Sequence, residues 1–184
     1  MDLEEIYHLL KDRHGPRSDP PTWWPVFYGH SKPPEFERVI TNILVQSSTW
    51  KAVPAAVEAL HHLNLLTARR LADAPVEEIA IAIKPTGLHL QKARRLKAIC
   101  NRTIEQFGGE EKFCNETTRS ELLLMEGIGE ETADRILLYS CGRLAWPVDT
   151  SYGPEIHSWP CGTAVGDAAS RGSKEQNLLG RMDL

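Results

Sequence analysis

The chain has 184 residues, of which 41% are hydrophobic and 25% are charged, and its formal net charge is −4. This composition is typical of a folded globular protein with a core of its own. The acidic balance disfavours binding to a polyanion through bulk positive charge, and no apolar run approaches the ~20 residues that cross a membrane. The first residues lack the basic and then apolar order of a secretory signal, so we expect a cytoplasmic protein with no membrane partner.

Apolar residues recur at helical spacing along most of the chain, and the sequence shows no strand pair, internal repeat or low-complexity tract. A short amphipathic helix is expected over residues 3–10, followed by a proline-rich loop with Trp23 and Trp24. Adjacent tryptophans cannot share one face of a regular element, so either both fill a seam between helices or one faces a ligand. Further apolar stripes predict a helix that begins near Phe36 and ends near residues 46–49, and a second helix capped by Ser48 or Thr49 with its core face over residues 53–60. They also predict helices over residues 75–83, 89–107 and 118–125. The fold class is therefore all-α, a multi-helix bundle.

The most informative stretch covers residues 121–150, where two helices are joined by a glycine-rich turn at residues 126–130. Thr118 and Glu121 fit a capping box at the start of the first helix. The glycines allow a close approach of the backbone. The second helix begins with unpaired N–H groups that can bind a phosphate. This helix-hairpin-helix predicts contact with a nucleic-acid backbone.

Residues 127–134 (GIGEETAD), followed by Val148-Asp149-Thr150, resemble the helix-hairpin-helix DNA glycosylases of the endonuclease III superfamily, the HhH-GPD group. The resemblance covers roughly residues 23–152, with several motifs in the family's order. It implies a monomer, in the cytoplasm of a bacterium or archaeon and associated with its nucleoid, that acts on double-stranded DNA containing a damaged base. The residues that would bind the DNA backbone, with a monovalent cation as candidate ligand, are Gly127, Ile128, Gly129 and Thr132.

The resemblance also divides the chain. Residues 1–35 would form an N-terminal helix and tryptophan loop that belong to a second domain, and residues 36–150 the helical domain with the hairpin. From Gly153 onward the sustained apolar period is lost, whereas the family continues through further helices. We expect residues 151–184 to be a divergent, poorly ordered tail that results from truncation or a frameshift, which leaves the second domain incomplete; a divergent disordered tail is the alternative.

The resemblance assigns roles to five residues. Asp149 would be the catalytic carboxylate, although on its own an Asp before a Thr is more often a cap or turn residue. Trp23, Trp24 and Trp50 would form the base pocket. Gln46, otherwise an ordinary polar residue at a helix end, would enter the gap left by the flipped nucleotide.

Glu131 decides the type of reaction. In bifunctional family members a lysine at this position forms a Schiff base with the sugar and permits strand cleavage, which a glutamate cannot do. We therefore predict a monofunctional glycosylase without AP lyase activity. Glu130 and Glu131 also place two acids where a phosphate is expected, and they should weaken DNA binding unless they point away.

For the substrate, the Trp-Trp-Pro segment and Trp50 resemble the endonuclease III-type 3-methyladenine DNA glycosylases. A cationic alkylated purine stacks well on tryptophan and is a good leaving group. One alternative is an oxidised-pyrimidine glycosylase with AP lyase activity, which Glu131 disfavours. The other is a non-catalytic DNA-binding remnant.

The four cysteines, Cys100, Cys114, Cys141 and Cys161, show no short pair spacing, so neither a zinc site nor a redox pair is expected. The chain also lacks the clustered C-terminal cysteines that hold an iron–sulfur cluster in many family members, so we expect no cofactor. Cys100 and Cys141 are interpreted as small core residues. A basic neighbourhood is either a solvated helix face or a DNA-facing patch; it comprises Lys84, Lys92, Arg94, Arg95, Lys97 and Arg102.

Overall fold

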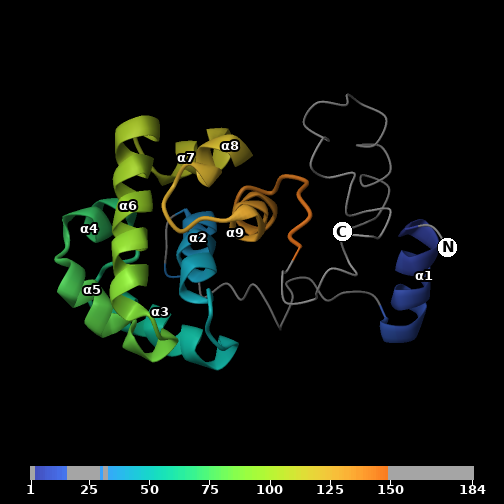
Figure 1. Cartoon of the computed structure of the whole chain (residues 1–184), viewed down its shortest axis with the longest axis horizontal. Helices are drawn as coiled ribbons and strands as arrows, with labels where there is room; N and C mark the ends of the chain where they lie inside the picture. Colours follow the sequence, from blue (N-terminus) through green and yellow to red (C-terminus); the bar gives the residue numbers. More distant parts are fainter. Residues whose placement is uncertain (1–2, 16–29, 31–32, 149–184) are drawn as a thin grey trace. The chain divides into compact units, whose positions relative to one another are not determined.

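The computed structural model describes residues 3–15, 30 and 33–148, and within them every regular element is helical (Figure 1). This confirms the predicted all-α fold. The predicted tail over residues 151–184 lies outside the described residues, as do Trp23, Trp24, Asp149 and Cys161. Contacts within the chain separate a unit of residues 1–26 and 148–184 from a unit of residues 27–147. The predicted domain boundaries at residues 35 and 150 stay predictions.

In the first unit the described helix is α1, Leu3–His14, which extends the expected segment by one turn. Ile6 and Tyr7 are half-buried, and Lys11 Nζ lies 5.5 Å from the centre of the Tyr7 ring. Leu10, which the helical spacing assigns to the apolar face, is nevertheless 53% exposed.

The second unit is a helical bundle. Its described elements are α2 (Pro34–Leu44), η1 (Trp50–Ala52), α3 (Val53–His62), α4 (Ala68–Asp73), α5 (Val76–Ala82), η2 (Lys84–Thr86), α6 (His89–Phe107), α7 (Glu110–Glu116), α8 (Arg119–Leu123), α9 (Glu130–Arg135) and η3 (Ile136–Ser140). The five expected stripes correspond to α2, α3, α5, α6 and α8, whereas the sequence does not predict α4 and α7. Among the described helices, none is both long and apolar enough to cross a membrane.

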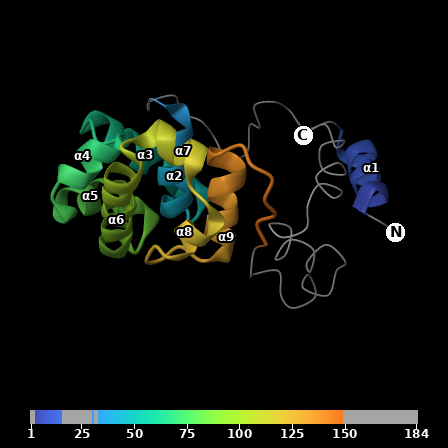
Figure 2. The same ribbon diagram turned by 90° about the horizontal axis from the view of Figure 1, so that it is seen from above.

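The long helix α6 organises the bundle. It packs against α2, α4, α5 and α7, with α4 and α5 on one side and α2 and α9 on the other (Figures 1 and 2). The apolar stripe predicted on α2 is fully buried, and Phe36, Val39, Ile40, Ile43 and Leu44 are each at most 1% exposed. Cys100 on α6 is also fully buried, as expected, and Cys141 is half-buried against the same core.

Four basic side chains bind carbonyl groups at the ends of helices other than their own. Lys92 Nζ donates to the carbonyl oxygens of Leu44 and Thr86, at 2.7 Å each. Lys97 Nζ donates to those of Ala72 and Ala74 at the end of α4. Arg143 binds the last carbonyls of α7 in the same way, and Arg38 binds Tyr139 at the end of η3. Each cation satisfies carbonyls that a helix end leaves unpaired and lies at the negative end of the helix dipole.

The basic neighbourhood of α6 is therefore neither a uniform solvated face nor a uniform DNA-facing patch. Lys92 is 0% exposed, and Lys97 is half-buried with its ammonium on carbonyl oxygens. Arg102 Nε donates to Gln106 on the same helix. Neither alternative includes the role that the structure shows: long basic side chains can bind the carbonyl oxygens at the ends of neighbouring helices.

Candidate functional site

The hairpin is built as the sequence predicts. Thr118 caps α8: its hydroxyl accepts a hydrogen bond from Glu121 N at 3.3 Å, and Glu121 Oε2 accepts from Thr118 N at 2.8 Å. The Thr118 hydroxyl also donates to Glu121 Oε2 at 2.8 Å. This bond first, and the bond from Thr118 N second, lower the pKa of Glu121 below its ordinary value. The turn then runs through Gly127, which has a φ of +78°, and Ile128, whose side chain is only 6% exposed. The Ile128 side chain thus anchors the turn in the core, while Gly129 after it is exposed.

An ion pair joins the two helices of the hairpin. Arg119 on α8 donates from Nε to Asp134 Oδ1 at 2.7 Å and from Nη2 to Asp134 Oδ2 at 3.1 Å. The Asp134 side chain on α9 is only 7% exposed, and this hydrogen bond raises the pKa of Arg119. A two-point contact of this kind fixes the angle between the helices as well as their distance.

Arg95 from α6 covers the first hairpin glycine. A Cβ atom on Gly127 would lie 1.9 Å from Arg95 Nε and 2.5 Å from Arg95 Cδ. At Gly129 a Cβ atom would meet nothing within 4 Å. The two glycines thus differ. Gly127 combines a left-handed backbone with close contact to Arg95, which requires glycine, whereas Gly129 lies open at the start of α9 and has room for a side chain.

Gln46 lies in the turn after α2, and its side-chain amide is bound to the hairpin. Its Nε2 donates to Gly127 O and to Thr132 Oγ1, at 3.0 Å each. Its Oε1 accepts from Arg95 Nη1 at 2.7 Å. Both amide protons and the amide oxygen are therefore used inside the protein. The structure brings the predicted Gln46, Gly127 and Thr132 together, and the entry of Gln46 into DNA stays a prediction.

The other predicted site residues are placed less completely. Trp50 begins η1, four positions after Gln46, and is half-buried against the core. The base-pocket residues Trp23 and Trp24 and the catalytic candidate Asp149 lie outside the described residues. Their roles stay predictions.

At the position that the resemblance assigns to the lyase lysine, the Glu131 carboxylate pairs with Arg135 one turn later on α9, and the Glu131 side chain is 23% exposed. Glu130 is 82% exposed and lies 3.8 Å from Arg119. Each acid at the start of α9 thus has an arginine close by, which offsets part of the repulsion expected between the two acids and a phosphate. In the described part of the chain, no three His, Cys, Asp or Glu side chains are grouped to hold a metal ion.

Sequence reasoning missed three features beside this cluster. Arg95 contacts both Gln46 and Gly127, and Lys92 holds the end of α2. Ser47 and Leu88 both have positive φ, at +49° and +46°, and Leu88 is 56% exposed. Gly87 marks a turn before α6, but a local pattern reveals neither a left-handed leucine nor a contact between distant segments.

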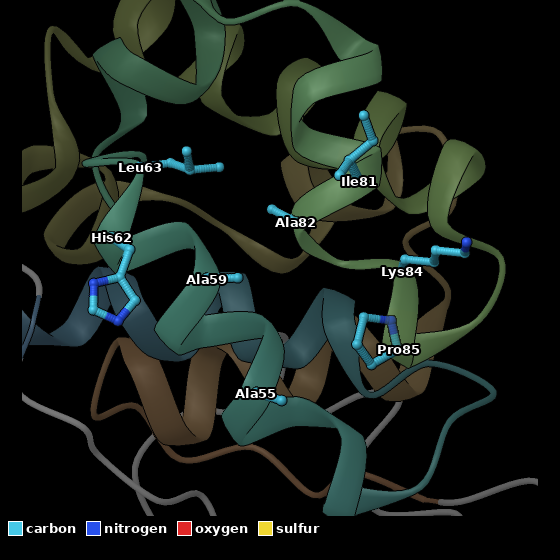
Figure 3. Close-up of a pocket in the computed structure, with 8 residues that line it drawn as sticks. All are labelled: Ala55, Ala59, His62, Leu63, Ile81, Ala82, Lys84 and Pro85. Atoms are coloured by element: carbon cyan, nitrogen blue, oxygen red, sulfur yellow. The ribbon is translucent and has the colours of Figure 1, made fainter.

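A shallow groove of about 850 Å³ lies elsewhere in the bundle. Figure 3 shows residues of α3 on one side of it and residues of α5 and η2 on the other. None of the predicted site residues lines the groove, and its lining carries neither a carboxylate nor a thiol; it consists of Ala55, Ala59, His62, Leu63, Ile81, Ala82, Lys84 and Pro85. We therefore place the candidate site at the hairpin cluster, defined as Gln46, Arg95, Gly127 and Thr132.

Comparison with protein families gives a match over residues 40–172 to the model described as HhH-GPD superfamily base excision DNA repair protein. A Methanocaldococcus jannaschii protein named as a DNA repair glycosylase is 32% identical over 152 residues, which cover 80% of this chain and 64% of that protein. Endonuclease III of Thermotoga maritima is 30% identical, over 66% of this chain and 54% of its own length. The chain therefore spans less than two thirds of either relative.

Solved structures show the same likeness. The crystal structure of the H. pylori 3-methyladenine DNA glycosylase bound to 1,N6-ethenoadenine matches with a TM-score of 0.75 and 26% identity, over 98% of this chain and 85% of that one. A trapped covalent complex of endonuclease III with DNA matches with a TM-score of 0.56 and 28% identity, over 63% of this chain and 52% of that one. Together with the hairpin geometry, these matches agree with the resemblance noted in the sequence.

Proposed function

The chain belongs to the HhH-GPD superfamily of base excision DNA repair proteins, and from that premise we propose that it is a monofunctional DNA glycosylase. It would hydrolyse the N-glycosidic bond of a damaged base in duplex DNA, with an alkylated purine as the substrate. The observation that carries the proposal is Glu131: the lyase position holds a carboxylate that is paired with Arg135. A carboxylate cannot form the Schiff base that strand cleavage requires.

The proposed reaction needs few groups. The nucleotide is extruded from the stack, and its cationic base is held between tryptophan rings, with Trp23, Trp24 and Trp50 as our candidates. Asp149 would stabilise the positive charge that develops on the sugar and orient the attacking water. The bond between sugar and base breaks, the neutral purine leaves, and the water oxygen bonds to the sugar carbon as its proton is released.

Lys92 does not provide the missing amine. It lies on the same helix as Arg95, but it is 0% exposed and its ammonium binds two carbonyl oxygens. A nucleophile must reach the sugar, and Lys92 is enclosed by the protein. This supports hydrolysis rather than lyase chemistry.

The hairpin would hold the DNA backbone through the amides around Gly127 and Gly129. Gln46 would fill the gap left by the flipped nucleotide. In the free protein its amide is bound to Arg95, Gly127 and Thr132, so entry into DNA requires that these bonds be exchanged. We propose that the chain acts as a cytoplasmic monomer that needs no cofactor.

The test is base release from alkylated duplex DNA, compared between the unmodified chain and its Asp149→Asn variant. We expect release by the unmodified chain only, with no strand nick before alkali and no complex trapped by borohydride. Nicking with borohydride trapping would instead favour an endonuclease III-type lyase, as several relatives are named. Binding without release from any damaged duplex, by a folded chain, would leave a DNA-binding remnant.

A further inference from the structure

Helix α6 holds Gln46 at two points. Arg95 contacts the end of the side chain through Oε1. One turn earlier on α6, Lys92 contacts the backbone at Leu44 O, the last residue of α2 and two positions before Gln46. The second acceptor of Lys92 is Thr86 O, in the turn that precedes Leu88. One ammonium thus joins two surface turns.

We propose that Lys92 is a positioning residue. Its buried ammonium fixes the turn after α2, which carries Gln46, relative to the turn before α6, which carries Leu88. It thereby sets the position from which Gln46 enters DNA. This inference rests on the proposed function for its last step only. The positioning itself is a property of the free protein, and it can be tested without DNA.

Backbone strain shows that both turns need such a clamp. Ser47 follows Gln46 with a φ of +49°, and Leu88 has a φ of +46°. A residue other than glycine is destabilised in this conformation, and the conformation persists only where the surroundings impose it. The two acceptors of Lys92 lie three residues before Ser47 and two before Leu88, at the points where the strained turns begin.

Burying the Lys92 ammonium is costly for a residue that has only a structural role. Lys92 is fully buried, and both of its acceptors are neutral carbonyl oxygens rather than carboxylates. Burial, followed by the nearby charge of Arg95, lowers its pKa from 10.5 to about 8. A methionine of similar length would avoid that desolvation, so the lysine costs stability that its contacts must offset.

Lys97 provides a matched control on the same helix. It is the same residue type and also binds two carbonyl oxygens, those of Ala72 and Ala74 at the end of α4. Those carbonyls belong to a different helix end from the ones beside Gln46 and Leu88. Lys97→Met therefore removes an equivalent interaction away from the candidate site.

The first readout is hydrogen exchange of the free protein, followed by mass spectrometry. In Lys92→Met we expect faster exchange in peptides that cover residues 44–49 and 86–90, and in Lys97→Met only in those that cover residues 72–76. Equal exchange across the chain in both variants would overturn the proposal. If Lys92→Met does not fold, Lys92→Gln keeps one short donor, and we expect the same two segments to respond more weakly.

The second readout uses duplex DNA with a tetrahydrofuran abasic analogue and 2-aminopurine in the opposite strand, whose fluorescence rises when it unstacks. At saturating protein we expect Lys92→Met to lose most of this rise while Kd changes less than about threefold, and Lys97→Met to keep it. Equal rises in the two variants would contradict the role in delivering Gln46. If the unmodified chain gives no rise, the entry of Gln46 into the gap is refuted, and the exchange result alone decides whether Lys92 holds the turns. Base release tests the proposed function separately.

Discussion

Replacing Gly127 with alanine tests whether Arg95 and the hairpin turn form one unit. The new Cβ atom would lie 1.9 Å from Arg95 Nε, so the Arg95 side chain would have to leave. The residue would also keep a φ of +78°, which disfavours any side chain.

The expected magnitude has two parts. The left-handed backbone costs alanine about 1 kcal/mol. Displacing Arg95 breaks its charged hydrogen bond to Gln46, a type of bond that contributes about 1.5–3 kcal/mol. We therefore expect Gly127→Ala to lower the free energy of unfolding by about 3 kcal/mol in the unmodified chain. In an Arg95→Ala background the clash and the bond are both absent, so the same change should cost only about 1 kcal/mol.

The assay is urea unfolding of four chains: unmodified, Gly127→Ala, Arg95→Ala and the double variant. A coupling free energy of about 2 kcal/mol is expected, within the range for residues in contact. Gly129→Ala is the control, because its Cβ atom meets nothing within 4 Å. Gly129 is the N-cap of α9, where glycine is better than alanine, so this change should cost about 0.5–1 kcal/mol. Additive costs for Gly127 and Arg95, or an equal cost at Gly129, would refute the reasoning.

Three further outcomes follow from the same contacts. The pKa of Lys92 is about 8 in the folded chain and 10.5 in the unfolded chain, so the unfolded chain binds more protons between pH 8 and pH 10.5. The free energy of unfolding should therefore rise by about 3 kcal/mol as the pH rises through this range. Unfolding curves of Lys92→Met should lack this rise. Glu131→Lys should yield a borohydride-trapped complex with damaged duplex that the unmodified chain does not form, and unchanged trapping would count against our assignment of the lyase position. Asp134→Asn should cost about 2 kcal/mol in thermal unfolding because Arg119 loses its charged partner, whereas a variant as stable as the parent would show that this pair does not fix the hairpin.

The parts of the fold that the sequence predicts are those with local signals. The stripe from Phe36 to Leu44 exceeds two helical turns, and Gly108 ends α6 with a φ of +78° as expected of a helix-terminating glycine. Helices α4 and α7, of six and seven residues, were not predicted. The equally short α5 and α8 were, because Pro75 and the capping box of Thr118 and Glu121 mark where they begin. Thr67, whose hydroxyl accepts from Arg70 N, was the one local sign of α4.

Three residues of the hairpin cluster, Gln46, Gly127 and Thr132, were named from the sequence, but Arg95 and the contacts that join the four were not. Gln46 and Thr132 are 86 positions apart, and Gln46 and Arg95 are 49 apart. No local pattern records such contacts, because they depend on how α2, α6 and the hairpin pack. The burial of Lys92 was not predicted for the same reason. A lysine beside two arginines is normally solvated, and Lys92 is buried because two distant carbonyl oxygens accept hydrogen bonds from it.

The bonding of Gln46 in the free chain bears on how damage would be distinguished from normal DNA. Its amide already makes three hydrogen bonds to the protein, so entering the helix exchanges these bonds for others and gains little from hydrogen bonding alone. The nucleotide must also be unstacked, at a cost of a few kcal/mol that is smallest for a damaged or poorly paired base. Because Gln46 gains little free energy on entering DNA, it does not outweigh the difference in unstacking cost between a damaged and a normal nucleotide. We therefore expect discrimination to begin at nucleotide extrusion, before the glycosidic bond is attacked.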